Sequence, residues 1–85
     1  MDFEEEVFKP FLGQWVVIGT PNFINPYKLF LEDGIVVAVE EGHVALKLKK
    51  GYRKIPYGDI LSIRIKGPVE TFEEEWREAN DNDQK

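Results

Sequence analysis

The residue types best suited to binding chemistry are basic and gather in one short stretch. Five of the eight residues from 47 to 54 are lysine or arginine, and they surround a tyrosine. At the tip of a predicted hairpin, such cations can neutralise phosphates while the aromatic ring stacks on a base. Lysines also protect sheet edges from aggregation, so a purely solubilising edge is the alternative. The candidate residues for binding a nucleic acid or an acidic partner are Lys47, Lys49, Lys50, Tyr52, Arg53 and Lys54, with Arg64 and Lys66 from the last predicted strand.

The charge of the chain is unevenly distributed around this stretch. Residues 42–68 carry seven basic residues and one acidic residue, whereas residues 1–41 carry two basic and eight acidic ones. Residues 69–85 again carry two basic residues against seven acidic ones, and the net charge is −5. A basic middle therefore lies between two acidic ends, which bears on partners and solubility and not on the fold.

Few residues of the sequence are suited to catalysis or to metal binding. There is no cysteine, and His43 is the only histidine, so neither a catalytic triad nor a multi-histidine metal site can be built. The two glutamate runs, 4–6 and 73–75, are contiguous and point in different directions on a helix. We therefore expect a protein that is not an enzyme, with no cofactor, no metal and no small-molecule substrate.

Length and hydropathy bound the architecture. The 85 residues are enough for one domain, and 42% of them are hydrophobic. No apolar run approaches the ~20 residues that a membrane helix needs, and the first six residues are acidic, unlike a secretion signal. We expect a cytoplasmic protein that does not enter a membrane.

The hydrophobic pattern predicts a mainly β fold. A short helix begins after Asp2 and ends near Phe8 or, after one more turn, near Phe11. Alternating and β-branched segments then predict about five strands, with a one-turn connector before the last strand, in which Leu61, Ile63 and Ile65 face inward. The predicted strands are 14–19, a bent strand over 27–39, 44–49, 52–55 and 61–66.

Two segments of this pattern allow alternatives. Asp33-Gly34 suits either a tight hairpin turn or a bend inside one long strand, and we favour the bend because Gly34 leads straight into 35–39. Both faces of 35–39 are apolar, so we expect something to cover the outside of that strand. The loop 21–26 holds Phe23 and Ile24, which either fold back on the core or form an adhesive rim.

A C-terminal helix is predicted from an apolar stripe. Val69, Phe72, Trp76 and Ala79 share one helical face, Thr71 with Glu74 resembles a capping box, and the polar residues 80–85 form a frayed tail. Phe72 and Trp76 either pack on the sheet, which we favour, or dock a partner or sister subunit. The single domain thus comprises a small barrel, residues 1–68, and an acidic helix with its tail, residues 69–85.

The strand pattern resembles the Sm-like and SH3-like small barrels over residues 11–67. The residues that carry the resemblance are the opening Leu12-Gly13-Gln14-Trp15-Val16-Val17, the bent Gly34-Ile35-Val36-Val37-Ala38-Val39 and the close, 44–48 followed by 55–63. The opening helix and the bent strand are more similar to the Sm and Hfq group, whereas the close is similar to the C-terminal barrel of the ribosome maturation factor RimP family. The Asp and Asn pair of the first Sm motif, which lines the uracil pocket, has no counterpart in Val39-Glu40-Glu41-Gly42-His43.

These observations lead to two functional hypotheses. The first is an Sm-like protein that binds RNA, with the cations of 47–54 on phosphates and Tyr52 stacked on a base. The second is an SH3-like protein-interaction module or assembly subunit that uses the same basic hairpin and the C-terminal helix. A homo-oligomer is compatible with either one, and the acidic helix can also lie on the basic patch of its own chain and compete with ligands.

Overall fold

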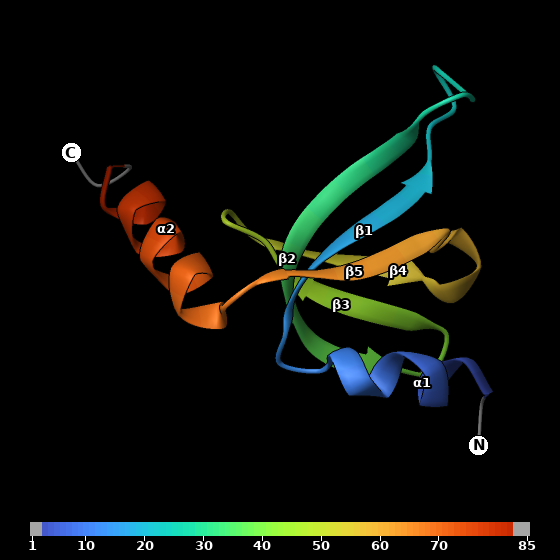
Figure 1. Ribbon diagram of the computed structural model, residues 1–85, viewed down its shortest axis with the longest axis horizontal. Helices are drawn as coiled ribbons and strands as arrows, with labels where there is room; N and C mark the ends of the chain where they lie inside the picture. The colour runs from blue at the N-terminus through green and yellow to red at the C-terminus, as the bar shows by residue number, and fades with distance from the viewer. Residues whose placement is uncertain (1–2, 83–85) are drawn as a thin grey trace.

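In the computed structural model, residues 3–82 are described, and they form an antiparallel five-stranded sheet with a helix at each end of the chain (Figure 1). Consecutive strands pair with each other from β1 to β4, whereas β5 follows β4 in the chain but pairs with β1. The elements are α1 (Phe3–Phe8), the 3-10 turn η1 (Lys9–Phe11), β1 (Trp15–Pro21), β2 (Leu29–Glu40), β3 (His43–Lys47), β4 (Tyr52–Pro56), the 3-10 turn η2 (Tyr57–Asp59), β5 (Ser62–Gly67) and α2 (Val69–Asn82).

The strands follow the order β4-β3-β2-β1-β5, and every pairing is antiparallel. The predicted mainly β fold with an N-terminal and a C-terminal helix is therefore confirmed. Among the described residues, β4 and β5 are not paired with each other, so the strongly bent sheet stays open and is not closed into a barrel. Pro56 ends the edge strand β4, as a residue without a backbone N–H should.

The long strand β2 is continuous through Gly34, which confirms the predicted bend and excludes the hairpin alternative. Its first half pairs with β1, from Pro21↔Leu29 to Trp15↔Ile35, and its second half pairs with β3, from Ile35↔Lys47 onward. A Cβ atom at Gly34 would lie 2.5 Å from the backbone oxygen of Lys47. Glycine is needed there because β3 joins β2 at the bend, where two backbones approach closely.

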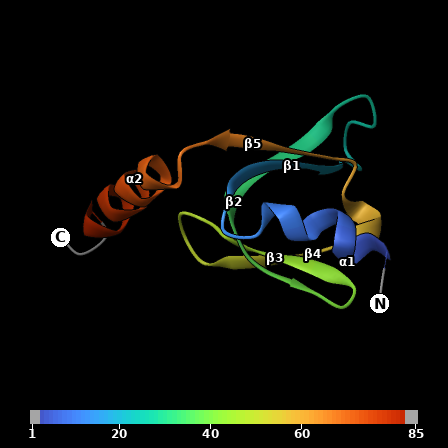
Figure 2. The ribbon, with the colours of Figure 1, turned by 60° about the horizontal axis from the view of Figure 1, so that its bottom comes forward.

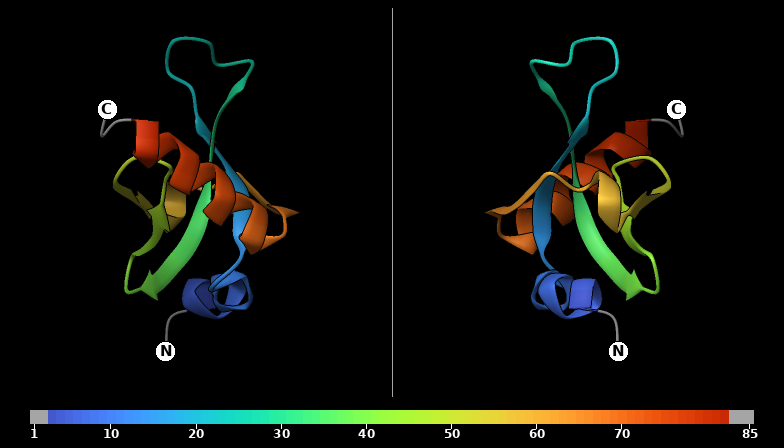
Figure 3. Two further views of the ribbon diagram at one scale, coloured as in Figure 1. Left: turned by 90° about the vertical axis from the view of Figure 1, so that its left-hand side faces the viewer. Right: turned by 90° about the vertical axis from the view of Figure 1, so that its right-hand side faces the viewer.

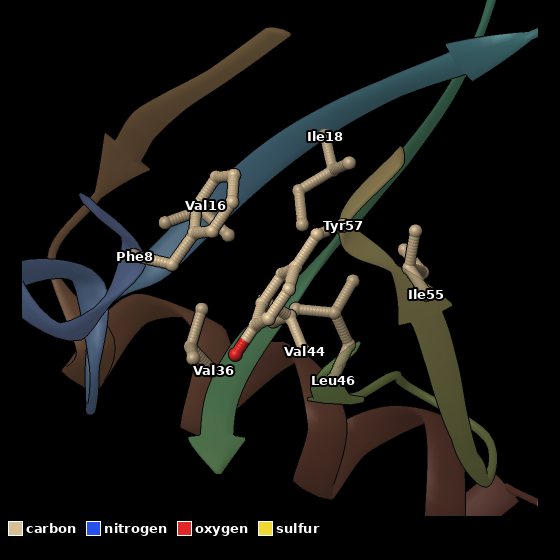
Figure 4. Packing of buried hydrophobic residues seen from close by; sticks show 8 residues of the cluster. All are labelled: Phe8, Val16, Ile18, Val36, Val44, Leu46, Ile55 and Tyr57. Atoms are coloured by element: carbon tan, nitrogen blue, oxygen red, sulfur yellow. The ribbon is translucent and has the colours of Figure 1, made fainter. Parts of the chain in front are cut away.

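The main core lies inside the curve of the sheet (Figure 4). Phe8 of α1 stacks on Tyr57 with ring centroids 5.3 Å apart, and the Tyr57 hydroxyl donates a hydrogen bond to the Glu40 backbone oxygen. The helix α1 and the turn η2 are thereby fixed to the core. The remaining members come from alternate positions of four strands: Val16, Ile18, Val36, Val44, Leu46 and Ile55.

A second, smaller cluster lies on the outer face and holds α2. Figure 2 shows α2 on the other side of the sheet from α1. The Phe72 side chain is fully buried (0% exposed) against Trp15 and Ile35, with the Phe72 and Trp15 ring centroids 5.6 Å apart. Val69 and Trp76 pack around it. We expected an element to cover the outside of 35–39, and that element is α2. It covers Ile35 but leaves Val37 exposed.

The loop between β1 and β2 projects beyond the other elements (Figure 3). We call residues 22–28 the arm. The Asn22 side-chain oxygen accepts hydrogen bonds from the backbone N–H groups of Ile24 and Asn25, and the Asn25 side-chain oxygen accepts one from Tyr27. Polar side chains therefore shape the turn from within, as is usual for asparagine, and they leave the apolar side chains outside.

Three local predictions are wrong. Leu61 and Ile65 are exposed, whereas Ile63 packs on the core. Leu61 lies before β5 begins at Ser62, and Ile65 lies on an edge strand with one neighbour. Thr71 does not cap α2, since the helix begins at Val69 and Thr71 lies in its first turn. Nor is Asn80 frayed: its side chain donates to the Lys49 and Trp76 backbone oxygens, and α2 continues through Asn82. Asp2 of the first predicted cap and residues 83–85 lie outside the described residues.

Candidate interaction surfaces

The predicted basic hairpin is formed by β3, β4 and the loop between them, but its side chains are divided between two faces. Lys54 lies opposite Ala45, and Tyr52 lies opposite Lys47, on the outer face of the sheet. Arg53 lies opposite the core residue Leu46, on the inner face. Neighbouring strand residues point to opposite faces, so the contiguous cations of the sequence do not form one continuous patch.

The acidic helix α2 engages two of these lysines. The Lys47 ammonium nitrogen lies 4.5 Å from the centre of the Trp76 ring, and the Lys49 nitrogen lies 3.5 Å from a Glu75 carboxylate oxygen. Asn80 donates to the Lys49 backbone oxygen at 3.2 Å. The helix predicted as a partner-docking element thus packs on its own sheet, as the alternative that we favoured expects. Phe72 presents no surface to a partner while α2 keeps this position.

Arg53 is held by an internal ion pair. Its Nη1 atom pairs with a Glu32 carboxylate oxygen from β2, and its guanidinium group lies 5.9 Å from the centre of the Phe30 ring. The Glu32 side chain is largely buried, whereas that of Arg53 is half-exposed. The pair connects β4 to β2 across the inner face, so Arg53 contributes to the fold as well as to any surface.

The two cations of the last strand lie apart from the hairpin in the strand order. β5 pairs with β1, at the opposite edge of the sheet from β4, so Arg64 and Lys66 do not extend the hairpin as a neighbouring strand would. The Lys66 nitrogen lies 3.5 Å from an Asp33 oxygen and 5.0 Å from the Trp15 ring centre. The Trp15 indole N–H also donates to Asp33, at 2.9 Å. Arg64 lies opposite Val17 on the outer face.

Tyr52 is the residue of the hairpin that is best placed to meet a ligand. Its side chain is 72% exposed, and the neighbouring Lys54 is exposed as well. A stacking ring beside a cation therefore remains on the outer face of β4. Lys50 lies at the loop and lines a hollow described below.

Among the large apolar side chains of the described residues, those of the arm are the most exposed. Phe23, Ile24 and Tyr27 are 94%, 98% and 95% exposed. Lys28 is the only charged residue of the arm. The sequence left two alternatives open for Phe23 and Ile24; the structure places both side chains in solvent and so excludes folding back on the core. Tyr27 was not predicted as a site residue, because the sequence places it at the start of the strand over 27–39, whereas β2 begins only at Leu29.

A shallow hollow of about 410 Å³ lies between the first half of β2 and the β3–β4 loop. One wall is formed by β2 residues that are apolar or acidic, and the other wall by three cations and a leucine. This hollow was not predicted, because it depends on where β2 and β3 separate at Gly34. The residues that line it are Phe30, Leu31, Glu32, Asp33, Leu48, Lys49, Lys50 and Arg53.

Within residues 3–82, no group of three or more His, Asp or Glu side chains is placed to hold a metal ion. His43 Nε2 instead lies 3.0 Å from a Glu40 carboxylate oxygen at the turn between β2 and β3. No described helix is long and apolar enough to cross a bilayer.

Comparisons were made with protein-family models, with curated proteins and with solved structures. None of the three finds a match to this chain. The class that the structure itself defines is a small, open, mainly β domain with two helices.

Proposed function

We propose that this protein is a non-enzymatic protein-interaction module whose arm docks on an apolar surface of a partner protein. The observation that carries this proposal is the nearly complete exposure of Phe23, Ile24 and Tyr27 at the tip of a projecting loop. The strand order and the bent β2 support the resemblance to the SH3-like small barrels. A protein-interaction module of this type is the second of the two functions expected from the sequence.

Physical reasons favour docking over a purely structural arm. Folded proteins rarely leave large apolar side chains clustered in water, and such clusters mark interaction sites. Large apolar side chains at the centre of an interface contribute most of its binding energy, and aromatic rings are enriched among them. The hydrogen bonds of Asn22 and Asn25 hold the turn in shape before binding, so less conformational entropy is lost when a partner is bound.

The proposal is tested with a triple variant of the arm. The wild-type protein and the variant Phe23→Ser/Ile24→Ser/Tyr27→Ser are each immobilised on a resin and exposed to an extract of the encoding organism. A partner that the wild type retains and the variant does not is then purified. Its affinity is then measured by calorimetry, where we expect the triple variant to bind at least about 100-fold more weakly. The control is Leu12→Ser/Leu61→Ser, which removes exposed apolar side chains elsewhere. Equal affinities for wild type and triple variant would refute the proposal.

RNA binding is the second candidate, and the observation that favours it is the exposed Tyr52 beside Lys54 on the outer face. Anisotropy of a labelled single-stranded RNA, titrated at two salt concentrations, tests this function. If phosphates are bound, the affinity falls steeply with salt, and Tyr52→Ala and Lys54→Ala each weaken it. Absence of binding at low salt would eliminate this candidate. We rank it second because α2 already engages Lys47 and Lys49.

A further inference from the structure

We propose that the hollow beside β2 binds an extended peptide segment of the partner as an added strand, and that this segment alternates acidic with apolar residues. This inference deepens the proposed function and rests on it, because it assigns a second contact and a chemistry to the partner of the interaction module. Strand addition to an open sheet edge is an established mode of peptide recognition, in which backbone hydrogen bonds supply affinity and side-chain pockets supply specificity.

The first half of β2 has a free edge. Residues Leu29–Ile35 pair with β1 on one side, but the pairing with β3 begins only at Ile35↔Lys47. β3 ends at Lys47, and the chain turns away into the β3–β4 loop. On the β3 side, the described residues therefore give Leu31 and Asp33 no strand partner.

The direction of the backbone groups follows from strand alternation. Val36 directs both groups to the β1 side: its N–H donates to the Gln14 oxygen at 3.0 Å, and its oxygen accepts from Gly13 at 2.8 Å. In an antiparallel strand, residues two apart direct their N–H and C=O groups to the same side. The backbone N–H and C=O groups of Glu32 and Gly34 thus point towards β1, whereas those of Leu31 and Asp33 point into the hollow.

The walls of the hollow indicate which side chains the added strand carries. Phe30, Leu31 and Leu48 supply apolar surface, and Leu48 also packs on the main core. The wall opposite β2 carries Lys49, Lys50 and Arg53. Lys49 also contacts Glu75 of α2, and Arg53 also pairs with Glu32 of β2, so the acidic side chains of an added strand share these two cations with the glutamates. Side chains of an added strand alternate between two sides, so one set meets apolar surface and the other meets cations. Charge complementarity therefore favours an acidic–apolar peptide.

A second copy of this chain fits the edge less well. Two copies paired through their β2 edges would bring two loops of the same charge together, each with Lys49, Lys50 and Arg53. Like charges placed opposite each other across an interface disfavour association. A partner segment with acidic residues has no such conflict.

The test uses a nine-residue blocked peptide in which valine alternates with glutamate, titrated into the ¹⁵N-labelled protein, residues 1–85, and followed by NMR. We expect shift changes centred on the Leu31 and Asp33 amides and on residues 48–53. A matched peptide with lysine in place of glutamate should bind about tenfold more weakly or not at all. The proposal is overturned if the glutamate peptide does not bind, or if its shifts lie elsewhere. It is also overturned if the same amides shift with protein concentration alone, because the edge then binds a second copy.

Two variants at one position test the backbone contact. Leu31→Pro removes an N–H that faces the hollow and leaves the hydrogen bonds to β1 in place, whereas Leu31→Ser retains the N–H and removes the same apolar side chain. We expect the proline variant to bind the peptide about tenfold more weakly than the serine variant. Equal affinities of the two folded variants would contradict strand addition. Circular dichroism establishes that both are folded.

This test separates the strand-addition proposal from the proposed function. The arm variant Phe23→Ser/Ile24→Ser/Tyr27→Ser changes no residue that lines the hollow, so it should bind the peptide as the wild type does. Loss of peptide binding in Leu31→Pro with partner binding intact would overturn strand addition alone. If the arm variant binds the partner as tightly as the wild type does, the proposed function alone would be overturned.

Discussion

The ammonium nitrogen of Lys47 lies 4.5 Å from the centre of the Trp76 ring and so joins the basic hairpin to the acidic helix. A second contact, between Lys49 and Glu75 at 3.5 Å, lies one helical residue away. A cation over an aromatic face at such a distance contributes about 0.5–1 kcal/mol at an exposed site. The helix therefore reduces the positive potential of the hairpin within the same chain, and several consequences can be measured.

Neutralising Glu75 should strengthen the binding of polyanions. Because Lys49 would lose its carboxylate partner, we expect Glu75→Gln to bind heparin or single-stranded RNA about two- to fivefold more tightly at low salt. The control is Glu74→Gln, which makes the same change of charge on the same helix but at a residue that borders a different surface, with Glu70 and Arg77. Equal gains in the two variants would show that only net charge matters and that the contact with Lys49 does not.

Truncating Phe72 should detach or loosen α2. This side chain is fully buried between Trp15 and Ile35, and removal of a buried phenylalanine side chain costs about 3–5 kcal/mol. We expect Phe72→Ala to lower the free energy of unfolding in urea by about 3 kcal/mol. Phe23→Ala is the control, since its ring is exposed and the change should stay within about 0.5 kcal/mol. A similar small loss in both variants would mean that α2 is not anchored through Phe72.

Replacing the glycine at the bend of β2 should destabilise the sheet. The Cβ atom of Gly34→Ala would lie 2.5 Å from the Lys47 backbone oxygen, so the two strands must move apart at their first pair. Overpacking of this kind costs about 1–3 kcal/mol, which a urea titration resolves. At Gly58, an added Cβ meets nothing within 4 Å, and Gly58→Ala should leave stability unchanged to within about 1 kcal/mol. Equal stability of Gly34→Ala and wild type would contradict the close approach of β2 and β3.

Amide hydrogen exchange should reveal the free edge of β2 without any ligand. Leu31 and Asp33 direct their N–H groups into the hollow, whereas the Glu32 N–H faces β1. We expect Glu32 to exchange at least about 100-fold more slowly than its two neighbours in the native protein. Uniform protection of residues 31, 32 and 33 would contradict the free edge, because it requires a partner on both sides of β2.

Much of the secondary structure could be predicted from local sequence. The bend at Gly34, the one-turn connector at 57–59 and the edge position of Pro56 all follow from the backbone restrictions of glycine and proline, and each is confirmed. The apolar stripe that begins at Val69 is confirmed as part of α2, whereas the capping box of Thr71 and Glu74 is wrong because both residues lie inside the helix. Val69 packs on the cluster of Trp15 and Phe72 and so extends the helix in front of Thr71. Tertiary packing here overrides a local capping preference.

The candidate site was predictable only in part, since alternation and register decide which side chains share a surface. The cations of 47–54 are contiguous in the sequence, but neighbouring residues of a strand face opposite ways, so Arg53 meets Glu32 on the inner face while Tyr52 and Lys54 stay outside. The hollow beside β2 joins residues 30–33 to 48–53. No local pattern relates these segments, because their proximity depends on the point at which β3 begins to pair with β2.

The sequence by itself determined the class of fold: apolar alternation, glycine and proline positions and an amphipathic C-terminal stripe are local properties that limit the backbone to short strands and two helices. Tertiary structure alone decided what this fold presents to a partner. It placed the acidic helix on Trp15 and Ile35, where it engages Lys47 and Lys49, and it left the arm and the first half of β2 uncovered. The physical reason is that burial and strand pairing depend on contacts between residues distant in the chain, and these contacts exist only once the sheet has formed.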